Sequence, residues 1–490
     1  MISMKLFKLT WYFQIQKYKN FMKSLVWLRN DLRMDDNPAL KHACINSDEV
    51  HCLYLFLPDQ MKSHNEANCK IEFIIESLKD LESNLSKINV PLTVITSKCF
   101  DDCTNLIMDV VNQRSINKVY WNNQLGYDEQ KRDTVVKEIL DKNCVFNESF
   151  DDQVVYSPGT IKTMEGKPYS VFTPFKRRWI ENFDMDFLDI EFKYTVKKES
   201  NIKSNVNNIT FEKDHSVDMS FWPAGEKTAL LKLKDYLDGK VIRYYKDRND
   251  PILEGTSRIS PYLASGVISS RRCILEALKR NDFKLDSGEK GIVKWVDEIV
   301  WREFYKNIMF SFPKVSKGHP FQDYTKNIKW RFDEDEFEAW KNGKTGFPII
   351  DSAMRQLKHE GWMHNRLRMV VAMFFTKNML HDWRLGEAFF MQNLIDGDFS
   401  SNNGGWQWSS STGTDAAPYF RIFNPITQSK NFDSDGLFIK KHISELKDLD
   451  KKEIHDPSPK IREYCEYPTE ILDLKSSRLR AIDAFSEAKN

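Results

Sequence analysis

The sequence predicts an α/β N-terminal domain with a parallel sheet of Rossmann-like topology, joined by a long linker to an all-α C-terminal domain. Two patterns carry this prediction: short apolar runs alternate with helical stretches up to about residue 142, and strand signals nearly vanish after residue 224. Strands separated by helices favour parallel pairing with right-handed crossovers. The chain of 490 residues is also longer than a usual single domain.

Each element of the first half follows from an apolar run or from helical spacing. Four runs are predicted to be buried strands: Ser24–Leu28, Val50–Leu57, Pro91–Thr96 and Lys118–Trp121. Four stretches have helix-compatible spacing: residues 37–46, 66–88, 101–115 and 128–142. Such sheets bind ligands beyond the strand carboxyl ends. No Gly-x-Gly-x-x-Gly follows the first strand and no Walker loop occurs, so a standard dinucleotide or triphosphate site is not supported.

The composition of the chain suggests four parts. Residues 1–21 carry four lysines and no acid, and we expect this N-terminal extension to lie outside the fold. Residues 22–150 would form the α/β domain, 151–223 the inter-domain linker and 224–490 the helical domain. Within the linker, residues 195–218 are polar and rich in lysine and asparagine, which is typical of a surface segment.

Charge and cysteine content exclude several classes of protein. The net charge is +1, from 72 basic and 71 acidic residues, so any nucleic-acid site must be a local basic patch. No run approaches the roughly 18 to 20 apolar residues of a membrane span, and we expect no membrane partner. The eight cysteines are scattered without zinc-site spacing, which favours reduced thiols in an intracellular, cytoplasmic protein without a structural metal.

Two polar motifs lie in the first part of the helical region. The segment Glu254–Ser260 (EGTSRIS) offers backbone and hydroxyl donors to an anion, although a plain helix N-cap explains it as well. In Val296–Tyr305 (VDEIVWREFY), helical spacing places four side chains on one face: Glu298, Trp301, Arg302 and Tyr305. Such a face suits a planar aromatic ligand, and the alternative is an amphipathic helix whose arginine extends along its surface.

Two further clusters lie nearer the C-terminus. Gly361–Met369 (GWMHNRLRM) is predicted to be a helix, in which Asn365 and Arg368 lead into an apolar run and therefore require partners. In Ile395–Trp408, Asp396 and Asp398 could pair with Arg368 or bind sugar hydroxyls, but two carboxylates without a third ligand do not make a metal site. A salt-bridged core arginine is the alternative. The tryptophans of this region suggest stacking or electron transfer.

These four segments, in this order, resemble the photolyase/cryptochrome family, and most closely its class I cyclobutane pyrimidine dimer DNA photolyases. The resemblance runs from about Met22 to the C-terminus and includes IDGDFSSNNGGWQWSSSTGTDAAPYFRIFNP. It implies that the helical domain binds FAD and DNA. It also implies an enzyme, a carbon–carbon lyase, in which excited, fully reduced FAD passes an electron to a pyrimidine dimer flipped out of DNA. We expect a monomer.

The resemblance assigns roles residue by residue. FAD would be held by Tyr244, Thr256, Ser257, Ile259, Ser260, Arg302, Asn365, Arg368, Asp396, Asp398 and Asn402. Arg368 and Asp396 would pair beside the flavin, and Asn402 would hydrogen-bond a nitrogen of its ring. The catalytic residues would be Glu298, Trp301, Met369, Asn402 and Trp408. Glu298 would donate a hydrogen bond or proton to the dimer, and the two tryptophans would stack on its bases.

Three further sets follow from the same resemblance. DNA would be contacted by Arg248, Glu298, Trp301, Arg366, Trp408 and Arg421. Electrons would reach oxidised flavin through Trp330, Trp383 and Trp406, for which core packing is the alternative. A second, light-harvesting chromophore, with 5,10-methenyltetrahydrofolate favoured, would bind at His64, Asp128, Glu129 and Lys317. Asp128 and Ser316 depart from the folate-binding pattern, so a deazaflavin or an empty antenna site stays open.

Other branches of the family fit the sequence less well. A cryptochrome-type light sensor often carries a long C-terminal tail and a different residue at the position of Asn402. A (6-4) photolyase would have a second histidine after His364 and a further one near Met369, but this chain has Asn365 and Met369 there. A DASH-type protein departs from the strings WMHNRLRM and NNGGWQW.

Overall fold

The computed structural model describes residues 21–213 and 216–489, so the predicted extension lies outside the described residues except for Phe21. The first part is a five-stranded parallel sheet in the order β3-β2-β1-β4-β5. Its strands are β1 (Lys23–Leu28), β2 (Glu49–Phe56), β3 (Leu92–Thr96), β4 (Lys118–Asn122) and β5 (Phe146–Phe150). The strand order reverses between β1 and β4, which is the Rossmann-like topology that the sequence predicts.

Helices cover both faces of the sheet, and this explains why its strands are apolar throughout. Val26 of β1 packs into a core with residues of α2 (Pro38–Asn46) and α4 (Asn68–Ser86). Its neighbour Trp27 packs on the other face with residues of α5 (Cys103–Arg114) and α6 (Tyr127–Lys142). A single residue step therefore changes the face, as strand geometry requires.

The predicted strands and helices of this part are found within a few residues of their expected bounds, but two elements are missed. The strand β5 reads FNESF, which is a polar, partly exposed edge strand without a buried apolar run. The helix α3 (Pro58–Ser63) is too short to show a period. A 3-10 turn, η1 (Phe100–Asp102), precedes α5.

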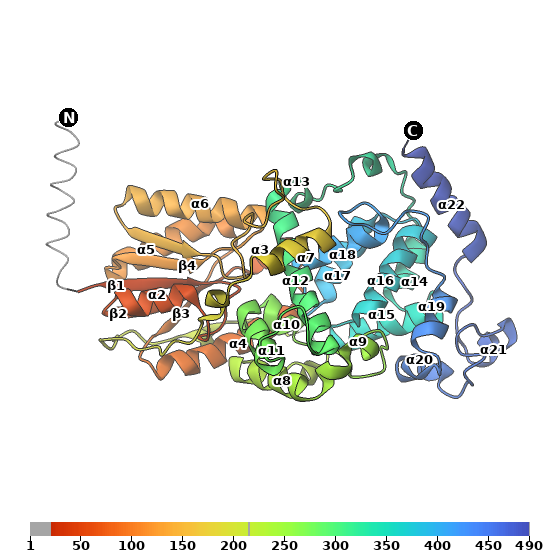
Figure 1. The fold of residues 1–490 in the computed structure, drawn as a ribbon, viewed down its shortest axis with the longest axis horizontal. Coiled ribbons are helices and arrows are strands. Elements are labelled where there is room, and N and C mark those ends of the chain that lie inside the picture. The colour runs from red at the N-terminus through yellow and green to blue at the C-terminus, as the bar shows by residue number, and fades with distance from the viewer. Residues whose placement is uncertain (1–20, 214–215, 490) are drawn as a thin grey trace.

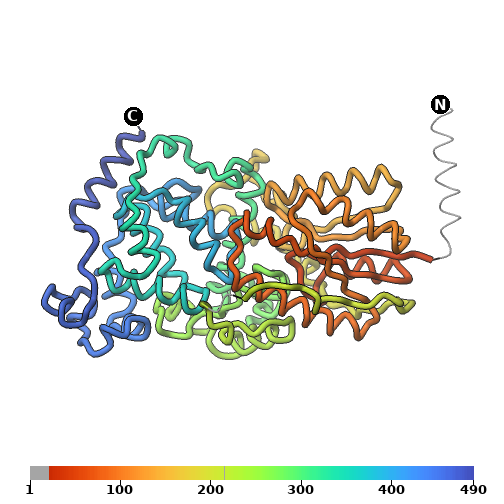
Figure 2. The backbone as a smooth tube through the Cα atoms, turned by 180° about the vertical axis from the view of Figure 1, so that it is seen from behind, coloured from red at the N-terminus to blue at the C-terminus, as the bar shows by residue number. Residues whose placement is uncertain are grey.

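The segment after β5 packs more closely than a surface linker. It contains α7 (Phe172–Glu181) and the 3-10 turns η2 (Met185–Leu188), η3 (Val206–Asn208) and η4 (Met219–Phe221). Asn205 bonds both the N–H and the carbonyl oxygen of Val94, at 2.7 and 3.0 Å, and Asn205 N–H donates to Leu92. This part of the chain lies along the open edge of β3 (Figure 2), where it satisfies edge groups that water would otherwise meet.

The second part is helical, as predicted, with α12 running between the sheet and the remaining helices (Figure 1). Its helices are α8 (Glu226–Asp238), α9 (Tyr244–Asp247), α10 (Ser260–Ala264), α11 (Ser270–Arg280), α12 (Lys290–Ser311), α13 (Pro313–Ser316), α14 (Glu334–Lys341), α15 (Pro348–Glu360), α16 (Asn365–Met373), α17 (Trp383–Asn393), α18 (Phe399–Ser410), α19 (Pro425–Phe432), α20 (Leu437–His442), α21 (Pro459–Tyr464) and α22 (Leu474–Glu487). Shorter turns are η5 (Lys240–Arg243), η6 (Asp323–Asn327), the π-helical η7 (Phe374–Asn378) and η8 (Ser444–Leu446). None of the described helices is long and apolar enough to cross a membrane.

Buried ion pairs fix the helical part against the sheet. Asp152, which follows β5, accepts from Arg33 at 2.5 Å and from Arg271 of α11 at 2.7 Å. Arg271 also pairs with Asp36 at 2.9 Å. Because removing one partner would leave an uncompensated buried charge, these pairs specify how the two parts meet.

Candidate functional site

Three helices, α12, α16 and α18, carry all the predicted catalytic residues, and α18 packs against the other two. A Cβ at Gly404 of α18 would lie 2.2 Å from the ring of Tyr305, so only glycine allows α18 this close to α12. A Cβ at Gly405 would meet no atom within 4 Å. Asn402 and Trp408 lie three residues before and after Gly405, and therefore flank this open space on one side of α18. At Gly405, therefore, no other part of the described structure covers α18.

The predicted pair of Arg368 and Asp396 forms in the structure. Nη2 of Arg368 donates to both carboxylate oxygens of Asp396, at 3.0 and 2.8 Å, and its Nε donates to the carbonyl oxygen of Met363. Asp396 also accepts from the hydroxyl of Ser260 at 2.6 Å. The side chain of Asp396 is 4% exposed and that of Arg368 is 25% exposed, so the guanidinium keeps one open side.

Asp398 has a different partner and does not converge with Asp396. Its carboxylate accepts from Nζ of Lys306 at 2.7 Å and from the N–H of Ser401 at 2.9 Å, so it also caps α18. Burial opposes its charge, but Lys306 and Arg302 outweigh burial and hold the pKa of Asp398 far below its usual range. The described residues contain no cluster of side chains that could hold a metal ion.

Asn402 is oriented by α17. Its Nδ2 donates to the carbonyl oxygen of Glu387 at 2.9 Å, which keeps the amide oxygen for another partner. Burial raises the pKa of the Glu387 carboxyl to about 7, although Asn403 donates to it at 3.4 Å. An amide oxygen fixed in this way can accept a hydrogen bond from an N–H group of a bound ring.

Helical spacing predicts that Arg302 faces the site, but its guanidinium contacts neighbouring elements instead. Its guanidinium donates to the carbonyl oxygen of Gln153, to the hydroxyl of Ser270 at 3.0 Å and to the carbonyl oxygen of Leu263 at 3.4 Å. These contacts hold α12 against α11 and the segment after β5. Among the four predicted side chains, Trp301 and Tyr305 do contact each other, with ring centroids 5.6 Å apart.

Glu298 and Arg248 form an ion pair at the rim of the site. Nη1 of Arg248 donates to Oε1 of Glu298, and the two side chains are 19% and 28% exposed. The guanidinium also lies over the ring of the buried Tyr244, 5.3 Å from its centroid. The next residue, Asn249, accepts from Arg366 of α16 at 2.8 Å. The segment after α9 thereby connects α12 with α16.

The two tryptophans that are predicted to stack on a bound group have different surroundings. Trp301 stacks on Phe172 of α7, with centroids 3.6 Å apart and planes 9° apart. A second ring can therefore reach Trp301 only from its other face. Trp408 is half-buried on α18. Met369 lies beside Arg366, whose Nη1 is 3.9 Å from the methionine sulfur.

The segment Glu254–Ser260 is a loop that ends at the start of α10. Thr256, Ser257 and Ser260 are half-buried, whereas Ile259 is buried. The hydroxyl of Ser257 accepts from the indole nitrogen of Trp295 at 3.2 Å. This loop therefore presents the hydroxyl groups of Thr256 and Ser257 shortly before Ser260, which contacts Asp396.

The predicted helix over Gly361–Met369 begins only at Asn365, so residues 361–364 lie outside it. The reason is a cap: Nδ1 of His364 accepts from the N–H of Arg366 at 3.2 Å. Asn365 is consequently an exposed residue in the first turn of α16.

The three tryptophans of the predicted electron path lie in or against one core cluster. Trp383 and Trp406 are members of it, and Trp330 packs against it. Trp406 contacts α17 at Gly386, one turn from Trp383. A fourth ring, Trp340, was not expected: its centroid lies 6.2 Å from that of Trp406, and it is fully buried. Nothing in the sequence distinguishes Trp340 from an ordinary core residue.

Arg421 lies outside these helices, in the segment that follows α18, and it is exposed. Its N–H donates to the carbonyl oxygen of Pro418 at 2.8 Å, which closes a tight turn. The neighbouring Phe420 is 59% exposed. An exposed cation and aromatic ring are thus presented together.

The predicted antenna residues come together around the first turn of α6. His64 lies 3.5 Å from both Asp128 and Glu129. Nζ of Lys317 lies over the ring of Tyr127, 4.0 Å from its centroid. His64 and Glu129 line a cavity of about 90 Å³ at the strand carboxyl ends. The remaining lining includes aromatic and basic side chains, among them Trp27, Tyr54, Phe100, Arg29 and Arg132.

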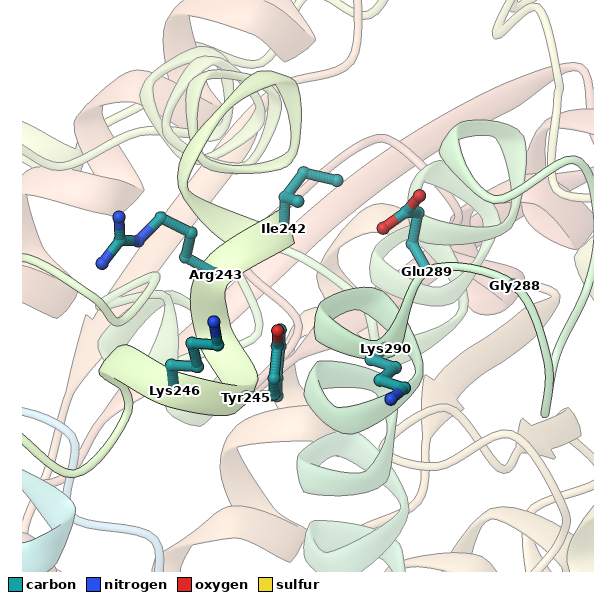
Figure 3. A pocket seen from close by; sticks show the side chains of 7 residues that line it. All are labelled: Ile242, Arg243, Tyr245, Lys246, Gly288, Glu289 and Lys290. Atoms are coloured by element: carbon teal, nitrogen blue, oxygen red, sulfur yellow. The ribbon is translucent and has the colours of Figure 1, made fainter.

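A separate surface hollow of about 460 Å³ lies between η5, α9 and the start of α12 (Figure 3). It is lined by Ile242, Arg243, Tyr245, Lys246, Gly288, Glu289 and Lys290. None of these residues belongs to the predicted site. This hollow therefore lies apart from the predicted site residues.

Sequence reasoning missed several residues that organise the site, because their role depends on contacts across the fold. Glu303 of α12 is buried and accepts from the N–H groups of Val155 and Tyr156 and from the indole of Trp179. Lys306 is buried beside Asp398. Both lie in the same helix as Glu298 and Trp301. A charged residue within an otherwise apolar helix face was the sequence feature that could have indicated their role.

Comparison with known proteins agrees with this geometry. The family model described as FAD binding domain of DNA photolyase matches residues 295–487, and the DNA photolyase model matches residues 24–193. A relative from Salmonella typhimurium, named deoxyribodipyrimidine photo-lyase, is 38% identical over 470 residues, which cover 95% of this chain and 98% of the relative. The chain belongs to the DNA photolyase family. The resemblance inferred from sequence is therefore confirmed.

Solved photolyases share the fold over almost the whole chain. A bacterial class III photolyase from Agrobacterium tumefaciens superposes with a TM-score of 0.85 at 31% identity and covers 96% of this chain and 98% of that one. An archaeal photolyase from Sulfolobus tokodaii, solved with two FAD molecules, gives 0.78 at 26% identity and covers 95% and 100%. The photolyase fold class predicted from sequence is thus confirmed.

The site fits the flavin that the matched model names. The open space at Gly405 would accept a planar ring, and Asn402 offers a fixed amide group at its edge. The open side of Arg368 and the exposed amide of Asn365 add donors on α16. Hydroxyl groups of the loop before α10 can bind phosphate or ribityl oxygens.

Proposed function

We propose that this photolyase repairs cyclobutane pyrimidine dimers in DNA with light, using the site between α12, α16 and α18. The observation that carries the proposal is the open space at Gly405, which Asn402 flanks on one side and Trp408 on the other. Polar groups for a cofactor lie toward Asp396, whereas the aromatic face of Trp301 and the rim residues Arg248 and Glu298 lie on α12 and after α9. One space therefore brings a cofactor and a flipped pyrimidine dimer into reach of each other.

When bound, FAD would supply the redox chemistry, which is the light-driven transfer of one electron to the dimer and its recovery after the bonds split. The protein holds and orients the cofactor. Arg368 and Asp396 would lie beside the ring, Asn402 would bond a ring nitrogen, and the hydroxyls of Ser257 and Ser260 would face the phosphate and ribityl chain. The remaining proposed FAD contacts are Tyr244, Thr256, Ile259, Arg302, Asn365 and Asp398.

On the substrate side, the residues of the chain bind and orient an extruded dimer. A damaged pair costs less to unstack than an intact one, and two aromatic platforms recover part of the lost stacking. Trp301, whose other face is covered by Phe172, offers one platform, and Trp408 offers the second. Glu298 would hold a proton or hydrogen bond at the dimer carbonyl, with Met369 lining the pocket.

We infer that a second chromophore binds at the carboxyl ends of the sheet strands. The cavity lined by His64 and Glu129 supports this proposal, and Asp128 and Lys317 lie around the same helix turn. Methenyltetrahydrofolate is proposed first. The aromatic lining of Trp27, Tyr54 and Phe100 favours a flavin-like ring as the second candidate, and the Sulfolobus protein contains a second FAD. Extraction of the chromophores followed by mass spectrometry decides between them.

The decisive experiment is repair by the purified protein. A synthetic duplex with one thymine dimer is incubated with FAD-loaded enzyme, under blue light or in the dark, and dimer loss is measured by chromatography. We expect the dimer to be lost only under light. We also expect the chain to act as a monomer on DNA inside the cell. The variants W301A and W408A should bind the dimer more weakly but keep FAD. Intact FAD without any repair would overturn the proposal and would indicate a light sensor instead.

A further inference from the structure

Lys377 is a fully buried cation in the helical part. It lies in the π-helical turn η7 after α16, and 0% of its surface is exposed. Among residues 21–213 and 216–489, no carboxylate lies within ion-pair distance of it. Burial, together with the nearby Arg421, lowers the pKa of Lys377 to about 7. Because a buried ammonium without a counter-charge is costly, its presence calls for a compensating role.

All hydrogen bonds from this ammonium go to one stretch of chain, residues 411–421. Nζ donates to the hydroxyl of Ser411 at 2.7 Å, to the carbonyl oxygen of Arg421 at 3.0 Å and to that of Pro418 at 3.4 Å. Ser411 ends α18 with a φ of 62°, and its hydroxyl donates to the carbonyl oxygen of Ala417. A single cation therefore joins the beginning and the end of this segment.

Residues 411–421 connect several parts of the proposed dimer pocket. The N–H of Ala417 donates to the carbonyl oxygen of Trp408 at 3.2 Å. Asp415 accepts from the N–H of Phe172 at 3.1 Å, and Phe172 is the residue that stacks on Trp301. Arg421 itself is the exposed cation of the segment. Loosening the segment would thus disturb both stacking platforms and a phosphate contact together.

The π-helical turn explains how Lys377 reaches this position. The N–H of Met379 donates to the carbonyl oxygen of Phe374 at 3.0 Å, which is the wider π-type spacing. The extra residue in the turn changes the direction of the side chains that follow, and such turns are frequent at functional sites. The hydroxyl of Thr376 bonds back to Ala372 at 2.8 Å and supports the same turn.

We propose that Lys377 is a positioning residue for recognition of the dimer: it holds residues 411–421 so that Arg421 faces DNA and Phe172 stays against Trp301. The inference rests on the proposed function, since it takes the pocket beside Trp301 and Trp408 as the dimer site. Lys377 is buried and acts only through the segment. Its loss should therefore weaken binding without changing the chemistry of a dimer that is already bound.

The test compares K377M with K377R and with K447M, which makes the same change at an exposed lysine. Methionine matches the length of lysine but removes the ammonium and its hydrogen bonds. We expect K377M to bind a dimer-containing duplex roughly tenfold or more weakly, as the loss of two or more hydrogen bonds to a charged group implies. FAD content and repair yield at saturating DNA should stay unchanged, and K377R should recover part of the affinity.

Hydrogen exchange supplies a readout that does not depend on repair. Amides of residues 412–421 should exchange faster in K377M than in the wild type, whereas those of α17 should not. If the wild type repairs no dimers, the proposed function fails, but faster exchange in this segment still shows that Lys377 holds it. Unchanged affinity, unchanged exchange or loss of FAD in K377M would each overturn the inference. S411A, which removes one contact, should shift affinity and exchange in the same direction by less.

Discussion

Arg248 and Glu298 have separate tasks in the proposed reaction, yet in the structure they bond to each other. A DNA phosphate that draws Arg248 away would release the Glu298 carboxylate from this ion pair, so that Glu298 could turn to the dimer. Binding of DNA and release of Glu298 would then be linked.

This linkage predicts that substitutions of Arg248 and Glu298 are not additive, because each breaks the same ion pair. We expect the effect of R248Q and E298Q together on dimer binding to differ from the sum of the two single effects by about 0.5 kcal/mol or more. Fluorescence anisotropy with a labelled dimer duplex measures the affinities of the wild type, the two single variants and the double variant. Additive effects would show that the two side chains act independently.

A second residue-scale prediction concerns Asp396, which accepts from Arg368 and Ser260. In D396N the shape is kept but the charge is lost, so Arg368 would face the cofactor without its partner. We expect FAD affinity to fall by about 1 to 2 kcal/mol, since hydrogen bonds to charged groups contribute more than neutral ones and Arg368 is partly screened by water. The ratio of flavin to protein absorbance measures the loss. D435N, at an exposed ion pair with Lys451, is the control and should retain FAD.

An aspartate partner for Arg368 could be expected from sequence, because Arg368 leads into an apolar run and requires a partner, but the choice of Asp396 over Asp398 came from the family resemblance. Asp398 shows the limit of that argument. Its partner, Lys306, lies 92 residues away and belongs to a helix whose other polar residues serve different contacts. Phe172 could not be predicted either, since nothing near it in the sequence indicates that it stacks on Trp301.

At the scale of elements, α12 is both a site helix and the support of the segment that follows the sheet. Glu303 accepts hydrogen bonds from Val155, Tyr156 and Trp179. Burial raises the pKa of Glu303 to about 7, from an ordinary value of 4.5. An acid with a raised pKa in the folded state binds more protons there than in the unfolded chain. Its contribution to stability is therefore full below pH 4.5 and is lost as the pH rises through 7.

We expect E303Q to lack this dependence. The difference in melting temperature between wild type and E303Q should change steadily between pH 5 and pH 7.5, to the disadvantage of the wild type at higher pH. The difference in unfolding free energy between the two proteins should change by at most about 3 kcal/mol across this pH range. Thermal unfolding followed by circular dichroism measures it. Parallel pH curves for the two proteins would mean that Glu303 is charged throughout.

The tryptophans on α14, α17 and α18 lead to a prediction about electron flow. Trp406 lies next to both Gly386 of α17 and Trp340 of α14. An oxidised tryptophan must be reduced from solvent, and Trp330 is half-buried whereas Trp340 is fully buried. W406F should therefore strongly slow light-driven reduction of FAD in the presence of a reductant, while W340F should not. Absorbance under blue light follows the reaction.

Repair by enzyme that has been reduced chemically beforehand is the control for these variants. It should persist in W406F, because the tryptophan path is needed only to reduce the cofactor. Equal slowing in W340F and W406F would place Trp340 on the path.

Elements were predictable where a strong period existed and not where tertiary contacts decided. The strands β1 to β4 were expected because their residues are apolar on both faces of the parallel sheet. The strand β5 is polar and was missed, since its place is set by pairing with β4 and not by burial. The start of α16 depended on the side chain of His364, and the linker was tied to β3 by Asn205. Such caps and edge contacts leave no periodic pattern in the sequence.

For the whole molecule, the near-zero net charge limits how DNA is bound. With a net charge of +1, long-range attraction contributes little, and affinity must come from local contacts and from insertion of the dimer. The proposed phosphate contacts are three arginines, Arg248, Arg366 and Arg421, which come from three separate elements. Under this proposal, the positive charge that DNA meets comes from these few side chains and not from the surface as a whole.

This arrangement predicts a shallow salt dependence. Each neutralised phosphate contributes about −0.9 to the slope of log affinity against log salt concentration, so three contacts give a slope of about −2.7. R421Q should reduce the magnitude of the slope by about 0.9, whereas K447Q, at an exposed lysine far from these contacts in the chain, should leave it unchanged. Fluorescence anisotropy with a labelled dimer duplex at several salt concentrations measures the slope. A slope steeper than about −5 would show that the DNA contacts many more cations than these three, because counterion release grows in proportion to the number of phosphates neutralised.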